Sequence, residues 1–145
     1  MRHVITENIG DMAVVECEGR IAHNTALELR DAIIAQSKAR VLVLDLSEVN
    51  AVEGDGLGVL VSLQYWAQQR GIQFKVFNPS NSVRHRLEHA SSMHGFEIAS
   101  LPEVMGLLIQ AENKSTRITS NIDAKQADDY NTSRSSRNVA SPSAA

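Results

Sequence analysis

The stretch from Val41 to Leu63, VLVLDLSEVNAVEGDGLGVLVSL, decides the fold of this protein. Four apolar residues, Val41 to Leu44, open it, and such a run is typical of a central parallel strand that is buried on both faces. A polar connection from Asp45 to Asn50 follows, and the glycines around Asp55 predict a tight turn into a helix. Because open α/β sheets meet ligands and partners at the carboxyl ends of their strands, Asp55 is the first candidate for a functional residue.

The composition is that of a small globular protein with no sign of nucleic-acid binding or membrane insertion. The 145 residues carry a net charge of −3, and no basic stripe interleaved with aromatic residues is visible. No apolar run approaches the roughly 20 residues of a membrane helix, and the first residues lack a signal-peptide core. Cys17 is the only cysteine, which excludes an internal disulfide and indicates a buried structural thiol. We therefore expect a cytoplasmic protein.

The apolar patterns predict an α/β fold in a single domain, with a mixed sheet of four to five strands and about four helices. The predicted strands are His3–Thr6, Met12–Glu18, Arg40–Leu46, Ile72–Phe77 and a short last one at Phe96–Ala99. The predicted helices run from Thr25 to about Lys38, from Gly56 to Arg70, from Ser80 to Ala90 and from Ser100 to near Glu112. The first two strands are joined by a short turn and should pair antiparallel. The sequence leaves open which face of the sheet carries most of the helices.

The apolar periodicity stops near residue 112. Residues 113–145 are rich in Ser, Thr, Asn and Asp and nearly lack large apolar side chains. Such a segment cannot bury enough surface to offset its ordering entropy. We therefore predict a domain over residues 1–112 and a disordered tail over residues 113–145.

Three residues have the sequence context of helix caps. Thr25 and Ser100 each stand three positions before a glutamate, the pattern of a capping box. Asp55 has two compatible interpretations. In one, its carboxylate is the N-cap of the helix and accepts backbone N–H bonds there. In the other, it is a fixed negative charge on a partner-binding surface.

No set of residues points to catalysis, a cofactor or a metal site. The glycine turn lacks the spacing of a dinucleotide fingerprint, and the magnesium-binding acids of a response-regulator receiver are not in place. No serine occupies the elbow of a hydrolase. A local group of acids lies along a connecting loop without the spacing of a cation site: Asp45, Glu48, Glu53 and Asp55. We therefore predict a protein with no enzymatic activity of its own.

The third predicted helix carries a basic polar face. Its members are Arg84, His85, Arg86 and His89. Such a face is usually solvated, and a surface for an acidic partner is the alternative. His85 and His89 are one turn apart, but no third ligand of fitting spacing accompanies them for a metal.

The order of elements, the strand Val41–Ser47 and the Gly56-Leu57-Gly58 opening of the next helix together resemble the STAS domain. This domain is shared by anti-sigma factor antagonists and the cytoplasmic ends of sulfate transporters. The resemblance covers about residues 3 to 112 and implies a protein-binding module without catalysis. In the antagonist branch it also implies a serine or threonine at the start of the second helix that a partner kinase phosphorylates. Here Asp55 replaces that hydroxyl and Gly54 replaces its neighbour.

The resemblance also implies a binding surface and a class of partner. We assign partner binding to Asn24, Glu53, Gly54, Asp55, Gly56, Asn78 and Ser80, with Asp55 as the equivalent of the phosphorylation site. The expected partner is an anti-sigma factor or a histidine-kinase-like ATPase, with a phosphatase or other STAS proteins as further candidates. The alternative function is a STAS subunit of a membrane lipid or anion transport complex that docks on an ATPase subunit.

Overall fold

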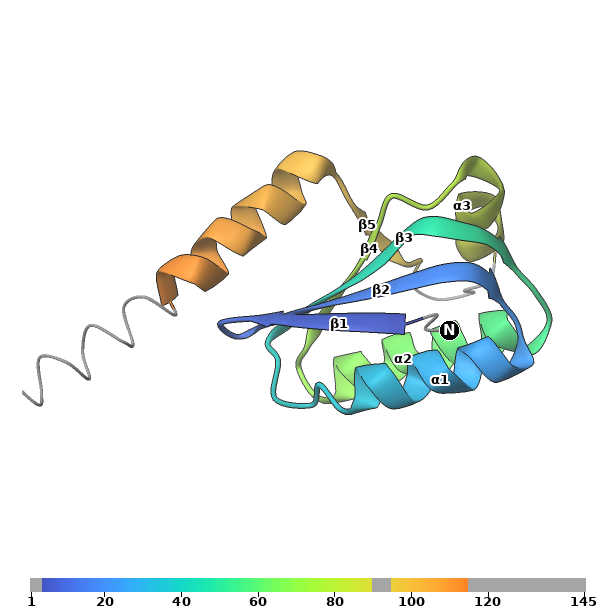
Figure 1. Ribbon diagram of the computed structural model, residues 1–145, viewed down its shortest axis with the longest axis horizontal. Coiled ribbons are helices and arrows are strands. Elements are labelled where there is room, and N and C mark those ends of the chain that lie inside the picture. The colour runs from blue at the N-terminus through green and yellow to red at the C-terminus, as the bar shows by residue number, and fades with distance from the viewer. Residues whose placement is uncertain (1–3, 90–94, 115–145) are drawn as a thin grey trace, which may run out of the picture.

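The computed structural model describes residues 4–89 and 95–114, which form one mixed sheet and four helices (Figure 1). The strands are β1 (Val4–Ile9), β2 (Met12–Ile21), β3 (Val41–Val52), β4 (Gln73–Phe77) and β5 (Glu97–Ala99). The helices are α1 (His23–Ile34), α2 (Asp55–Gln69), α3 (Asn81–Glu88) and a helix over residues 101–114. The sheet order is β1-β2-β3-β4-β5; β1 and β2 pair antiparallel and every other pair is parallel. The predicted mixed sheet with an antiparallel first pair is confirmed.

The two long crossover helices cover the same face of the sheet. Figure 1 shows α1 and α2 side by side beneath it. The strands turn alternate residues toward them, as a period of two requires. The fully buried side chains of this layer include Ala13, Val15, Leu29, Ile33, Leu42, Leu44, Leu60 and Leu63. This layer is the main hydrophobic core.

The predicted polar connection from Asp45 to Asn50 is wrong, because β3 continues through it to Val52. Two register shifts against β2 each place one extra residue in β3. These bulges change the spacing of the inward-facing residues from two to three, so that Leu46, Val49 and Val52 are buried in turn. In the sequence, this part of β3 resembles a loop, because its residues are largely polar and its buried residues do not alternate regularly. The acids of this segment stand on a strand.

Helix 101–114 covers part of the opposite face of the sheet. It contributes Val104 and Ala111 to a second apolar cluster with Met12, Val43 and Ala99. The β1–β2 turn meets this helix at Gly10, which has a φ of +58° and lies directly against the Ala111 carbonyl group. Lys114 adds an ion pair to Asp11 at 3.1 Å. The helix extends two residues beyond its predicted end, and the rest of the predicted tail lies outside the described residues.

The predicted helix caps have mixed outcomes. Ser80 was not predicted as a cap, but its hydroxyl accepts from the Val83 N–H at 3.3 Å and caps α3. The predicted cap Ser100 accepts from the Glu103 N–H through its hydroxyl at the same distance. The carboxylate of Glu103 turns away to Lys75, so the second half of that capping box is absent. The capping box at Thr25 is wrong. Helix α1 begins two residues earlier, Ala22 is its N-cap, and no side chain caps it.

Candidate functional site

Two turns at the carboxyl ends of β2 and β3 form the candidate site. The Glu53 N–H donates to the Ile21 carbonyl at 2.9 Å, which holds the β3–α2 turn against the β2–α1 turn. Gly56 reinforces this arrangement, because it packs on the Ile21 backbone with no space for a side chain. The first turns of α1 and α2 are thereby fixed next to each other. The site lies where open α/β sheets usually bind their partners.

The interpretation of Asp55 as an N-cap is wrong. Gly54 is the N-cap residue of α2, with a φ of +46° that suits glycine, and no side chain caps this helix. Asp55 is the first helical residue. Its carboxylate still meets the positive end of the helix, which favours a negative charge. Among the described residues no backbone N–H donates to this carboxylate, so it is free to face a neighbouring element.

That neighbouring element is the start of α1. The Nδ1 atom of His23 lies 3.3 Å from a carboxylate oxygen of Asp55. Beside it, the Arg20 Nε atom lies 3.3 Å from a carboxylate oxygen of Glu53. The Asp55 side chain is 76% exposed and that of His23 is 66% exposed. All four side chains are exposed, so a partner can reach them. Exposed pairs of this kind stabilise a fold by only about 0.2–1 kcal/mol, so a partner can separate them at little cost.

Arg20 and His23 were missed by the sequence reasoning. Both follow the second predicted strand, Met12–Glu18, at the same edge of the sheet as Asp55. Parallel strands place their carboxyl ends together, and this topological rule is a signal that could have found them. Asn24 follows His23 in α1 and is exposed, so it belongs to the same surface.

Asn78 and Ser80 belong to a second group of residues. Asn78 has a φ of +55° and donates from Nδ2 to the Ser47 hydroxyl at 3.1 Å. The Asp45 carboxylate accepts from the Ser47 hydroxyl and, at 2.9 Å, from the Ser47 N–H; Ser47 lies in the bulge of β3, where the described register gives it no partner residue in β2. This chain of bonds links the end of β4 to the middle of β3. The predicted site residues thus divide into the Asp55 turn and the Asn78 turn.

Cys17 of β2 is a buried free thiol. Burial raises the pKa of the Cys17 thiol from 9.0 to about 11, so this nucleophile stays protonated near neutral pH. Residues 4–89 and 95–114 contain no group of three or more His, Cys, Asp or Glu side chains placed to hold a metal ion. Within the same residues, no helix has both the length and the apolar character that crossing a bilayer requires.

Solved structures of similar fold include several anti-sigma factor antagonists. SpoIIAA in its unphosphorylated form is 14% identical, with a TM-score of 0.61 over 74% of this chain and 96% of SpoIIAA. An anti-sigma factor antagonist from Mycobacterium paratuberculosis is 24% identical, with a TM-score of 0.60 over 72% of this chain and 92% of its own. A serine-to-glutamate variant of Moorella thermoacetica RsbS is 18% identical, with a TM-score of 0.60 over 75% of this chain and 97% of its own. These low identities establish the fold alone.

Sequence comparison assigns the family. No curated protein sequence gives a significant match. The sequence profile of the STAS domain, however, matches residues 3–100, which include all five strands, the three helices between them and both groups of candidate site residues. Together with the mixed sheet and the glycine-dependent turn into α2, this match shows that the chain belongs to the STAS domain family.

Proposed function

We propose that this protein is a non-catalytic binding module that regulates a partner through the Asp55 turn, in the manner of a partner switch. The observation that carries this proposal is the exposed carboxylate of Asp55, placed at the positive end of α2 and held 3.3 Å from His23 of α1. The turn is fixed by backbone contacts, so it presents a constant shape. A preformed surface with a defined charge is suited to recognition.

The charge at Asp55 is the distinctive part of the proposal. SpoIIAA has been solved in unphosphorylated and phosphorylated forms, and RsbS as a serine-to-glutamate variant, so structures of this fold exist with and without added negative charge. A phosphoserine carries a charge of about −1.5 to −2 at neutral pH, whereas a carboxylate carries −1 and reaches less far. Asp55 therefore imitates the phosphorylated state in part and permanently. A partner that prefers the unphosphorylated state should bind this surface weakly.

The proposed partner is an anti-sigma factor or a histidine-kinase-like ATPase. Such a partner would contact the Asp55 turn together with Arg20, His23 and Asn24. Because the carboxylate is exposed, its contribution to binding should depend on ionic strength. Because it is not a cap, its replacement should leave the fold almost unchanged.

The test is a titration of candidate ATPases encoded near this gene against the wild-type protein, Asp55→Ser and Asp55→Asn, at low and at high salt. We expect both variants to bind a conventional anti-sigma factor about tenfold more tightly than the wild type, with a weaker salt dependence. Asp31→Asn is the matched control, because Asp31 is an exposed acid on a different helix, α1, and its only ion pair among the described residues is to the adjacent Arg30. Its affinity should equal that of the wild type. Equal affinities for all four proteins would contradict the role of Asp55.

A further inference from the structure

Helix 101–114 has a second apolar face that no described residue covers. Val104 and Ala111 point into the protein, whereas Leu101, Met105 and Ile109 are 59%, 48% and 53% exposed. These three residues are spaced by four along the helix, so they form one row. An amphipathic helix that packs on its own domain needs only one apolar face. The second row is therefore available to something outside the domain.

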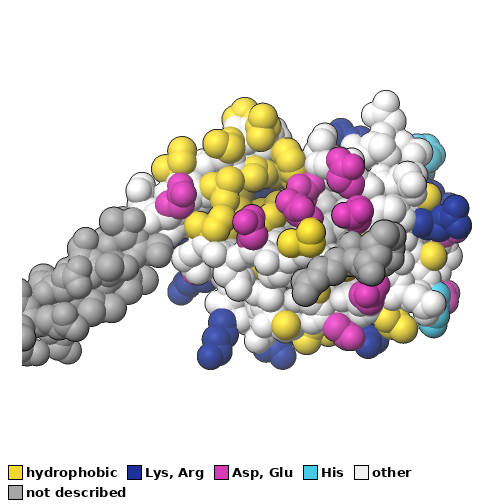
Figure 2. Space-filling model, viewed as in Figure 1, with side chains coloured by type: hydrophobic (Ala, Val, Ile, Leu, Met, Phe, Trp, Pro, Cys, Tyr) yellow, Lys and Arg dark blue, Asp and Glu magenta, His cyan; other side chains and the backbone are white. Residues whose placement is uncertain are grey.

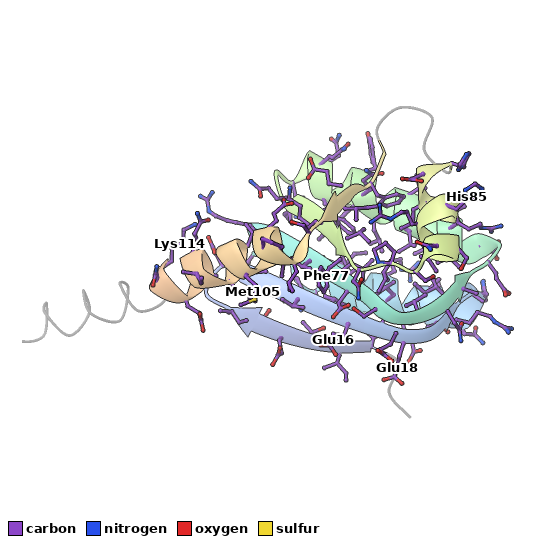
Figure 3. All side chains as sticks on the ribbon, turned by 90° about the horizontal axis from the view of Figure 1, so that it is seen from above. Glu16, Glu18, Phe77, His85, Met105 and Lys114 are labelled. Carbon is purple, nitrogen blue, oxygen red and sulfur yellow. The ribbon has the colours of Figure 1, made fainter. Side chains whose placement is uncertain are left out.

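The apolar row continues onto the sheet. Figure 3 looks onto the face that α1 and α2 leave uncovered, and it shows Met105 near Phe77. Figure 2 shows hydrophobic side chains gathered over this helix and the adjoining strands, directly beside a group of acidic side chains. Val14 and Phe77 are half-buried at this junction. We call this surface, from helix 101–114 across β3, β2 and β1, the open face.

The acidic half of the open face is built from paired carboxylates. In the parallel register Glu16 stands beside Asp45, and Glu18 stands beside Glu48. Like charges on neighbouring strands destabilise a sheet. No Lys, Arg or His among the described residues forms an ion pair with any of the four. Together with Ile5, Cys17 and Ser47 they line a hollow of about 260 Å³.

One cross-strand row shows how the two halves meet. The register places Phe77 of β4 beside Asp45, Asp45 beside Glu16, and Glu16 beside Ile5 of β1. Two carboxylates therefore lie between two large apolar side chains on the same face. This row of side chains is suited to bind a lysine or an arginine. The charged head of such a residue pairs with carboxylates, and its aliphatic stem packs on apolar surface.

We propose that the open face binds an amphipathic helix of a partner protein whose polar side is rich in lysine and arginine. The apolar side of that helix would cover Met105, Ile109 and Phe77, and its cations would neutralise the two rows of carboxylates. Such a partner would relieve the repulsion between the paired carboxylates of the free protein. This surface is separate from the Asp55 turn, so the inference does not depend on the proposed function.

Two other occupants fit the open face less well. In a second copy of this chain, the basic surface would be α3, which exposes Arg84 and Arg86. None of the exposed large apolar side chains of the described residues lies on α3, so a second copy would leave the apolar row uncovered. A membrane with anionic lipids would be repelled by the four carboxylates.

The test is selection from a displayed library of random peptides of about 16 residues, roughly four helical turns, against the full chain. We expect the recovered peptides to be basic, with large apolar residues spaced by three and four. Their affinity should fall at least about tenfold for Glu16→Gln and for Ile109→Lys, and not for the control Asp31→Asn. The thermal stability of Glu16→Gln in the absence of peptide should rise, because one repulsive pair is removed. Opposite effects of one substitution on stability and on binding would not arise from a purely structural role.

Three results would overturn the proposal. One is recovery of no peptide, or of peptides that are acidic or that bind both variants as tightly as the wild type. Another is a concentration-dependent dimer in analytical ultracentrifugation that Ile109→Lys abolishes, which would make a second copy the occupant. The last is binding of the full chain to vesicles of phosphatidylserine and phosphatidylcholine that Ile109→Lys abolishes, which would make a membrane the occupant.

Discussion

A Cβ atom added to Gly56 would lie 2.4 Å from the carbonyl oxygen of Ile21. Real Cβ atoms do not approach a backbone oxygen so closely, and neither the backbone of α2 nor that of β2 can move freely to relieve the contact. Gly56 is held in α2, and the Ile21 carbonyl already accepts the Glu53 N–H at 2.9 Å. The requirement for glycine here therefore comes from the distance between a helix and a strand. Backbone conformation alone would not impose it.

This contact predicts the effect of Gly56→Ala. The added methyl group should force α2 away from β2 and lower the free energy of unfolding by about 1–3 kcal/mol. Gly58→Ala is the matched control, since Gly58 lies two residues further along α2 and an added Cβ there would have nothing within 4 Å. That variant should gain about 0.5–1 kcal/mol, because alanine is the better helix former. Urea denaturation measures both, and equal stabilities of the two variants would contradict the close contact.

Lys75 predicts a loss of stability in strong alkali. Its ammonium lies 3.0 Å from Glu97 and 3.0 Å from Glu103, and its side chain is only 16% exposed. The hydrogen bond to Glu97 is the main cause that raises the pKa of Lys75 above its ordinary 10.5. The unfolded chain loses this proton first, so the stabilisation is complete below pH 10.5 and is lost as the pH rises through the higher pKa of the folded state.

The variant Lys75→Met tests this dependence. It should be less stable than the wild type at neutral pH, because two carboxylates remain next to each other without a cation. The difference in melting temperature should shrink as the pH rises above 10.5. Lys38→Met, which removes an exposed lysine, should keep a constant difference from the wild type. A gap for Lys75→Met that does not change with pH would exclude the titration of Lys75 as its cause.

The buried thiol of Cys17 should make the stability depend on pH in a range that begins below that of Lys75. Desolvation raises the pKa of this thiol from 9.0 to about 11. Between these values the unfolded chain ionises and the folded chain does not, so the wild type should lose stability from pH 9 upward and level off near pH 11. Cys17→Ala should lack this decline. Iodoacetamide should modify the native protein slowly and the urea-unfolded protein fast, and rapid modification of the native thiol would show that it is not buried.

Truncation tests the proposed domain boundary. A chain that ends after Lys114 keeps all described elements, so its melting temperature should lie within a few degrees of the full chain. A chain that ends after Glu112 loses the pair between Lys114 and Asp11, which is worth about 0.2–1 kcal/mol at an exposed site. Differential scanning calorimetry compares the three chains. Loss of cooperative unfolding in both truncated chains would show that residues 115–145 contribute to the fold.

Sequence patterns predicted the order of the elements because each regular strand and helix keeps its own period. They failed at β3, where two bulges replace the period of two with a spacing of three. They also failed at Asp55, because the position of the N-cap depends on the positive φ of Gly54. The pair of Asp55 with His23 and the acidic rows of the open face could not be predicted. The first depends on the distance between two turns, and the second depends on the register between neighbouring strands. The spacing of apolar residues along the sequence carries no information about either.

The length of β3 has one more consequence. Only Val41–Asp45 pair with β4, whereas the strand continues along β2 to Val52, so its later residues have a strand neighbour on one side alone among the described residues. Helix α3 contacts β3 and buries Val83 and Leu87 in the main core. If heating releases α3 before the sheet melts, the later half of β3 becomes an open edge that can pair with the same edge of another molecule. Aggregation of this protein should therefore begin with the loss of its shortest helix.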